Sequence, residues 1–64
     1  MDQEKFDLSV RKFLKQAGVT SQQQIEDAVR NTDLTGKDTL QVKIVLTAED
    51  TGLKHIVEGE IDLS

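Results

Sequence analysis

The sequence contains no cysteine among its 64 residues, and it has very few aromatic residues. Without cysteine, a disulfide, a thiolate nucleophile and a cysteine-based zinc site are all excluded. Tryptophan and tyrosine are absent too, and two phenylalanines are too few to build the aromatic platform on which single-stranded nucleic acid stacks. These absences remove several classes of chemistry before any motif is considered.

Long apolar runs are also missing. The longest, Ile44-Val45-Leu46, is far too short to span a membrane. The first residues, Met1 to Lys5, are mostly charged or polar and form no apolar segment of a signal peptide. We therefore expect a soluble, cytoplasmic protein without a membrane partner.

Positive charge is scarce in the second half of the chain. The sequence has 8 basic and 12 acidic residues, a net charge of −4. Acidic and basic side chains balance in residues 1–30, so the whole excess lies in residues 31–64. A protein that neutralises a phosphate backbone usually carries the opposite charge, so a nucleic-acid partner is not expected.

The chain is short for independent folding. For a protein of this size, burial of apolar surface contributes about 90 kcal/mol at ~25 cal/mol per Å². Conformational entropy at ~1.5 kcal/mol per residue opposes folding by about the same amount. Because the two nearly cancel, a partner is expected to add stability, and the simplest partner is a second copy.

The first half predicts two helices. One apolar face with helical spacing predicts a helix over residues 3–17, formed by Phe6, Val10, Phe13, Leu14 and Ala17. Gly18 follows as a left-handed stop. Thr20 and Ser21 are N-cap residues with glutamine three positions later, and they predict a second helix over about 21–30. Its buried residues would be Ile25, Ala28 and Val29.

The second half changes to a period of two. After a polar loop over 31–39, alternating apolar residues predict strands over about 40–47 and 54–62, with a turn between them. Pairing Thr47 with Lys54 sets Val45 opposite Ile56 and Lys43 opposite Glu58. A slip of two residues would set Val45 opposite a charge, so cross-strand pairing favours this register.

These elements predict a single α+β domain over 1–64, with two N-terminal helices packed on a C-terminal antiparallel hairpin (ααββ). A lone hairpin leaves two open edges, and Val45 and Ile56 form an apolar pair on its second face. We expect a homodimer with Val45 and Ile56 in the interface. It would form either a four-stranded sheet or two hairpins packed face to face.

His55 is the only histidine, and a functional interpretation makes it a general base or a metal ligand beside Glu58 and Glu60. Strand alternation places both glutamates on the opposite face, and no second histidine completes a metal site. A partly buried residue at the strand end is the preferred interpretation. The acidic residues Glu49 and Asp50, and the row of acids on the second strand, match no calcium loop.

Residues 13–25 resemble a helix-turn-helix, in which Gln22 to Gln24 and Arg30 would reach bases. Glu26 and Asp27 on the same helix argue against it, and two helices covering a hairpin explain the same residues. Arg11, Lys12 and Lys15 form a modest basic patch. No phosphate-binding loop, catalytic residue set or cofactor fingerprint is present, so no catalytic, cofactor or metal residue is assigned.

Three segments carry a resemblance to a known group: residues 11–15 with 18–21, residues 25–30, and residues 55–61. The chain resembles short bacterial proteins grouped as a domain of unknown function, over most of its length. The resemblance implies a bacterial origin and a stand-alone protein, and it implies no activity or functional residue.

The sequence thus predicts a homodimeric interaction or binding module without catalytic activity, whose protein partner is not identified. Two alternatives stay open. One is a weak nucleic-acid-binding protein of the helix-turn-helix type, and the other is a small-ligand or metal-binding protein that uses His55 and nearby acids.

Overall fold

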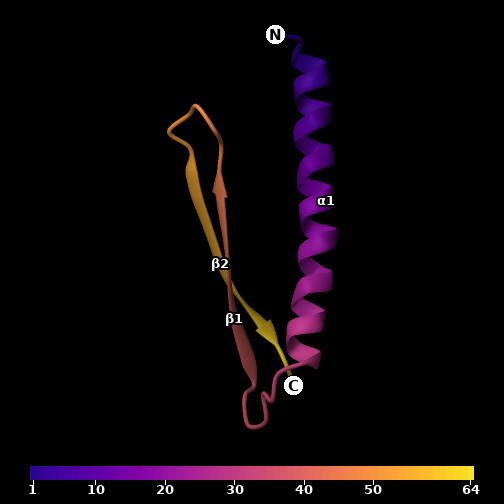
Figure 1. Ribbon diagram of the computed structural model, residues 1–64, viewed down its shortest axis with the longest axis vertical. Helices are drawn as coiled ribbons and strands as arrows, with labels where there is room; N and C mark the ends of the chain where they lie inside the picture. Colours follow the sequence, from indigo (N-terminus) through magenta and orange to yellow (C-terminus); the bar gives the residue numbers. More distant parts are fainter. The chain divides into compact units, whose positions relative to one another are not determined.

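A computed structural model describes all residues 1–64 (Figure 1). The order of elements is a helix, α1 (Gln3–Arg30), and two strands, β1 (Thr39–Thr47) and β2 (Lys54–Asp62). The α+β class is therefore confirmed. The chain divides into two units, Met1–Leu34 with the helix and Thr35–Ser64 with the hairpin, and each is described by itself.

The ends of α1 are defined by polar caps. Asp2 has an extended conformation, and its carboxylate accepts hydrogen bonds from the backbone amides of Glu4 (3.0 Å) and Lys5 (3.2 Å). These amides have no partner inside the helix, so the aspartate stabilises the first turn. At the other end, the amide of Asn31 donates to the carbonyl oxygen of Asp27 (3.0 Å), and the helix stops there.

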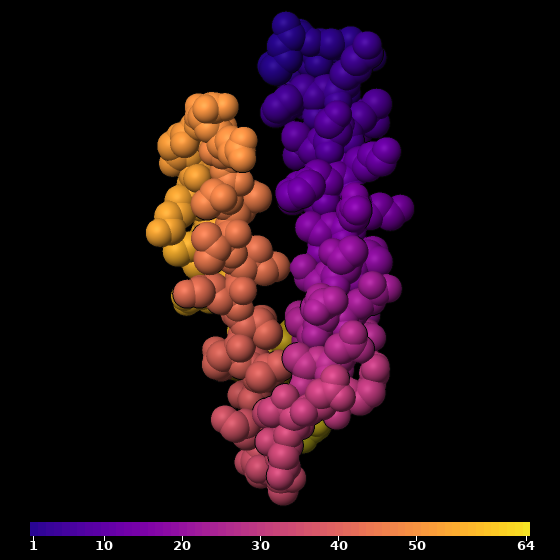
Figure 2. Space-filling model, viewed as in Figure 1, coloured from indigo at the N-terminus to yellow at the C-terminus, as the bar shows by residue number.

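The prediction of two helices, over 3–17 and 21–30, is wrong: the structure has one helix of 28 residues. Gly18 does not have a left-handed conformation, and it lies inside the helix. Thr20 caps nothing. Its hydroxyl donates to the carbonyl oxygen of Gln16 (3.0 Å), as threonine does in the interior of a helix. In the space-filling view this segment is one unbroken rod (Figure 2).

The physical reason for the single helix is the cost of starting a helix. A second helix over 21–30 would need its own nucleus, and isolated helices of that length are marginal in water. Continuing through Gly18 costs only about 1 kcal/mol relative to alanine. Residues 18–21 do have the types typical of a helix stop and a helix cap, but the continuous helix has the lower free energy.

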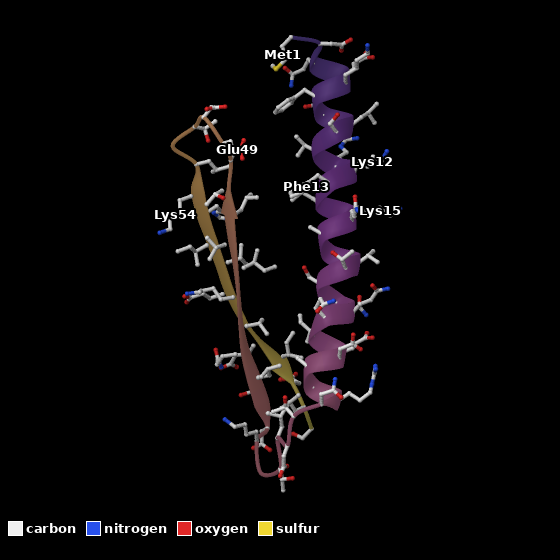
Figure 3. All side chains as sticks on the ribbon, in the orientation of Figure 1. Met1, Lys12, Phe13, Lys15, Glu49 and Lys54 are labelled. Atoms are coloured by element: carbon white, nitrogen blue, oxygen red, sulfur yellow. The ribbon has the colours of Figure 1, made fainter.

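The continuous helix also aligns its apolar residues. Positions spaced by 4, 4, 3, 4, 4 and 3 residues form one stripe along α1, apolar except at Ser21, which we call the helix stripe: Phe6, Val10, Leu14, Ala17, Ser21, Ile25 and Ala28. Phe13 flanks it, and Figure 3 shows this ring on the side of the helix away from Lys12 and Lys15. A spacing that averages close to 3.6 residues keeps the stripe on one side of a straight helix.

The hairpin has the predicted register. β1 and β2 are antiparallel, with Thr47 opposite Lys54, Val45 opposite Ile56 and Thr39 opposite Asp62. The pairing runs without a bulge from one end of the strands to the other. Alternation along each strand therefore divides the side chains cleanly between two faces.

The turns of the second unit are set by local hydrogen bonds and two left-handed residues. The hydroxyl of Thr51 donates to the carbonyl oxygen of Ala48 (2.8 Å) and accepts from the amide of Leu53 (3.1 Å). Asp50 has a φ of 61°, a conformation that aspartate tolerates better than most residues. Gly36, before β1, has a φ of 85°, for which glycine is suited.

Neither unit has a hydrophobic core of its own. No residue is buried, and many large apolar side chains are exposed in both units, among them Phe13 on the helix and Ile44 on the hairpin. A two-stranded hairpin is marginal on its own in water. Each unit by itself therefore leaves its apolar side chains without a core to bury them.

Candidate functional site

The two faces of the hairpin differ in composition. One, here called the apolar face, carries Leu40, Val42, Ile44, Leu46, His55, Val57, Gly59 and Ile61. The other, here called the mixed face, carries Thr39, Gln41, Lys43, Val45, Thr47, Lys54, Ile56, Glu58, Glu60 and Asp62. The mixed face contains the apolar pair that the sequence predicted as an interface.

Val45 and Ile56 are direct cross-strand partners, and they are 49% and 47% exposed. On the same face, the next pair away from the turn is Lys43 and Glu58. One pair further, the side-chain amide of Gln41 donates to a carboxylate oxygen of Glu60 (2.7 Å). The mixed face is thus a band of polar pairs with one exposed apolar pair, and whether a partner covers that pair stays a prediction.

The direction of the backbone groups follows from one hydrogen bond. The amide of Leu63 donates to the carbonyl oxygen of Asp38 (2.8 Å), so these opposite residues form a hydrogen-bonded pair. Hydrogen-bonded and non-hydrogen-bonded pairs alternate in an antiparallel ladder. Since the register has no bulge, every residue of the apolar face belongs to a hydrogen-bonded pair, and every residue of the mixed face to a non-hydrogen-bonded one.

The residues of the mixed face therefore turn their backbone N–H and C=O groups outward, to the two edges of the hairpin. The sheet has only two strands, so each edge lacks a neighbouring strand. The edge of β1 carries Thr39, Gln41, Lys43, Val45 and Thr47. The edge of β2 carries Lys54, Ile56, Glu58, Glu60 and Asp62. Such unpaired rows are templates for pairing with another strand.

His55 lies opposite Leu46 on the apolar face and is exposed. Glu58 and Glu60 lie on the mixed face, so the structure does not bring them together with the histidine. No three histidine or acidic side chains gather closely enough to hold a metal ion. Figure 3 places Glu49 in the turn and Lys54 at the beginning of β2. The geometry gives His55 no partner for acid–base or metal chemistry.

The nucleic-acid alternative loses its structural basis in α1. A helix-turn-helix requires a turn near Gly18, and the helix is continuous there. Two of the predicted base-reading side chains bind neighbouring acids. Gln22 donates to a carboxylate oxygen of Glu26 (3.1 Å), and Arg30 donates to Asp27 (3.0 Å). The basic residues Arg11, Lys12 and Lys15 remain on the exposed polar side of the helix.

The sequence alone did not reveal which residues present their backbone N–H and C=O groups at the edges of the hairpin. The predicted register already implied that one set of residues has outward backbone groups, but deciding which set requires one hydrogen bond of the ladder. The bond between Leu63 and Asp38 supplies it. The candidate site is consequently larger than Val45 and Ile56 alone, because it includes the backbone of both edges.

No helix of the structure combines the length and the apolar composition that a membrane crossing needs. The comparison with curated proteins finds no match, and the comparison with solved structures finds none either. One family model matches residues 1–64, which is the entire sequence, and its description is "Family of unknown function (DUF6494)". The resemblance inferred from three segments is thereby confirmed at the level of the family. The chain belongs to this family of unknown function, DUF6494.

Proposed function

We propose that this protein is an interaction module that works as a homodimer and performs no chemistry of its own. The observation that carries the proposal is that neither unit buries a side chain, although both carry many apolar residues. Soluble monomers seldom expose large contiguous apolar patches, and such patches mark interaction sites.

The hairpin supports the proposal independently of the helix. Its apolar face includes Ile44 (55% exposed) and Val57 (50% exposed), which lie opposite one another. Its mixed face exposes the pair of Val45 and Ile56. Two strands leave both edges unpaired, and three or more strands are usually needed for a stable sheet. A second hairpin would supply strands and apolar surface together, and closed twofold dimers are the commonest way to do so.

The test is the mass and stability of the protein in solution. Sedimentation at tens of micromolar should give twice the chain mass of 7.1 kDa. The midpoint of thermal unfolding should rise with protein concentration, because association stabilises the folded state by mass action. A monomer with a midpoint independent of concentration would overturn the proposal, and would mean that the chain covers its apolar surfaces by itself.

A pair of substitutions then examines the predicted interface. Val45→Lys and Ile56→Lys should both weaken the dimer if a partner packs over the mixed face, whereas pairing through the β1 edges alone would leave Ile56→Lys nearly without effect. Leu34→Lys, in the loop before β1, is the control and should weaken the dimer less. Equal effects of all three substitutions would remove the mixed face from the interface.

A further inference from the structure

The two edges of the hairpin offer different chemistry to a second copy, and this inference rests on the homodimer proposed above. We propose that two copies pair along β1, edge to edge and antiparallel, with Ile44 of each copy on the twofold axis. The result is a four-stranded sheet in the order β2–β1–β1–β2. The chemistry of the two edges, the neighbours across the seam and the closure of the assembly each favour this arrangement.

The choice of edge follows from the side chains that meet at the seam. On the apolar face, β1 contributes only aliphatic residues: Leu40, Val42, Ile44 and Leu46. β2 contributes His55 and Gly59 to the same face, and glycine has no side chain with which to cover a neighbour. A seam between two β1 strands therefore buries more apolar surface than a seam between two β2 strands.

Charge favours the same edge. The outward-facing residues of β1 include a single charge, Lys43. Those of β2 include Glu58, Glu60 and Asp62 against Lys54, a net charge of −2. Joining two β2 edges concentrates negative charge, and charged side chains on an edge strand are a common device against pairing. β2 therefore has more of the features of a protected edge than β1, whose only outward charge is Lys43.

The choice of register follows from cross-strand neighbours. With Ile44 opposite Ile44 of the second copy, Val42 meets Leu46 of that copy, and Leu40 meets Ala48. On the mixed face, Lys43 meets Val45, so no charge opposes a like charge. Moving the axis to Lys43 would set the two lysines opposite each other.

The two other close registers are poorer as well. An axis at Val42 would set Leu46 opposite Asp38 of the second copy, a carboxylate against a leucine of the apolar face. An axis at Val45 would pair only residues 43–47 of the two strands, because β1 ends at Thr47 and Asp50 lies in the turn. The Ile44 register is the one in which aliphatic residues meet aliphatic residues along the whole seam.

The proposed dimer is closed, whereas a head-to-tail pairing of the same edges would let the assembly grow into a filament. Pairing β1 with β2 of the next copy would join Lys43 to an acidic edge, but it leaves the same two edges open after every addition. Twofold pairing of β1 consumes both β1 edges at once and leaves only the acidic β2 edges exposed. The dimer is thus a closed assembly.

Amide hydrogen exchange of the full-length protein shows which edge of the hairpin pairs with the second copy. In the proposed dimer, the outward amides of Gln41, Lys43, Val45 and Thr47 become hydrogen-bonded between copies and should exchange at least about tenfold more slowly than in diluted monomer. The outward amides of Ile56, Glu58 and Glu60 should stay as fast as before. A dimer that protects the β2 amides, or neither set, overturns this inference while the homodimer survives. A monomer overturns both.

Cysteine cross-linking tests the register of the two β1 strands. Because the natural chain contains no cysteine, each introduced cysteine is the only one in its chain. The two Ile44 residues would form a non-hydrogen-bonded pair with Cα atoms about 4.5 Å apart, within the range of a disulfide. Ile44→Cys should therefore give a covalent dimer faster under mild oxidation than Val42→Cys, Lys43→Cys or Val45→Cys. Val57→Cys, at the cross-strand partner of Ile44, is the matched control on β2 and should cross-link slowly. Fastest cross-linking at another position overturns the register, and assemblies that grow with concentration overturn the closed dimer.

Discussion

Gly18 lies in the middle of α1, in a helical conformation, with open space where a side chain would begin. Glycine loses more conformational freedom on folding than alanine does, and it weakens a helix by about 1 kcal/mol. We expect Gly18→Ala to raise the free energy of unfolding by up to about 1 kcal/mol, measured by urea denaturation at fixed protein concentration. A destabilised Gly18→Ala variant would indicate a helix stop at this position after all.

Gly36 has the opposite character, because its φ of 85° strains any residue with a side chain. We expect Gly36→Ala to lower the free energy of unfolding by about 1 kcal/mol. Gly52 is the matched control, since it also lies in a turn with open space but has no left-handed φ. Gly52→Ala should be neutral or slightly stabilising in the same urea experiment, and equal losses at both positions would contradict this explanation.

At the scale of the structural element, one hydroxyl group stabilises the turn between β1 and β2. Thr51 bridges Ala48 and Leu53 with two hydrogen bonds. Thr51→Val keeps the shape of the side chain and removes both bonds, so it should cost about 1 kcal/mol of unfolding free energy. Thr51→Ser retains the hydroxyl and should cost clearly less. If both variants lose the same amount, the hydroxyl is not what stabilises the turn.

The elements also show what the sequence could predict. The register was predictable because Val45, Lys43 and Gln41 each find a suitable partner in only one alignment of the strands. The helix boundary was not, because Gly18 and Thr20 have the local chemistry of a stop and a cap, and only the cost of a second nucleus decides against them. The outward backbone of β1 depends on ladder geometry, which composition alone does not reveal. A partner copy lies outside the chain, so its position has to be inferred from exposed surface.

At the scale of the whole molecule, the proposed dimer would bring two acidic hairpins together. Residues 35–64 carry three basic and six acidic side chains, a net charge of −3. Repulsion between such units is screened over a distance of about 10 Å at 0.1 M salt. We expect the dimer dissociation constant, measured by sedimentation, to fall severalfold when the salt concentration rises from about 0.02 to 0.2 M. A dimer that weakens with added salt would point to attractive ion pairs between copies.

The spacing of the helix stripe restricts how the length of this protein can change during evolution. Inserting or deleting a single residue near Gly18 turns the rest of α1 by roughly 100° about its axis. Ile25 and Ala28 would then leave the side on which Phe6 and Val10 lie. A change of about 11 residues, close to three full turns, preserves the stripe. Length differences within the helices of DUF6494 proteins should therefore come in whole turns.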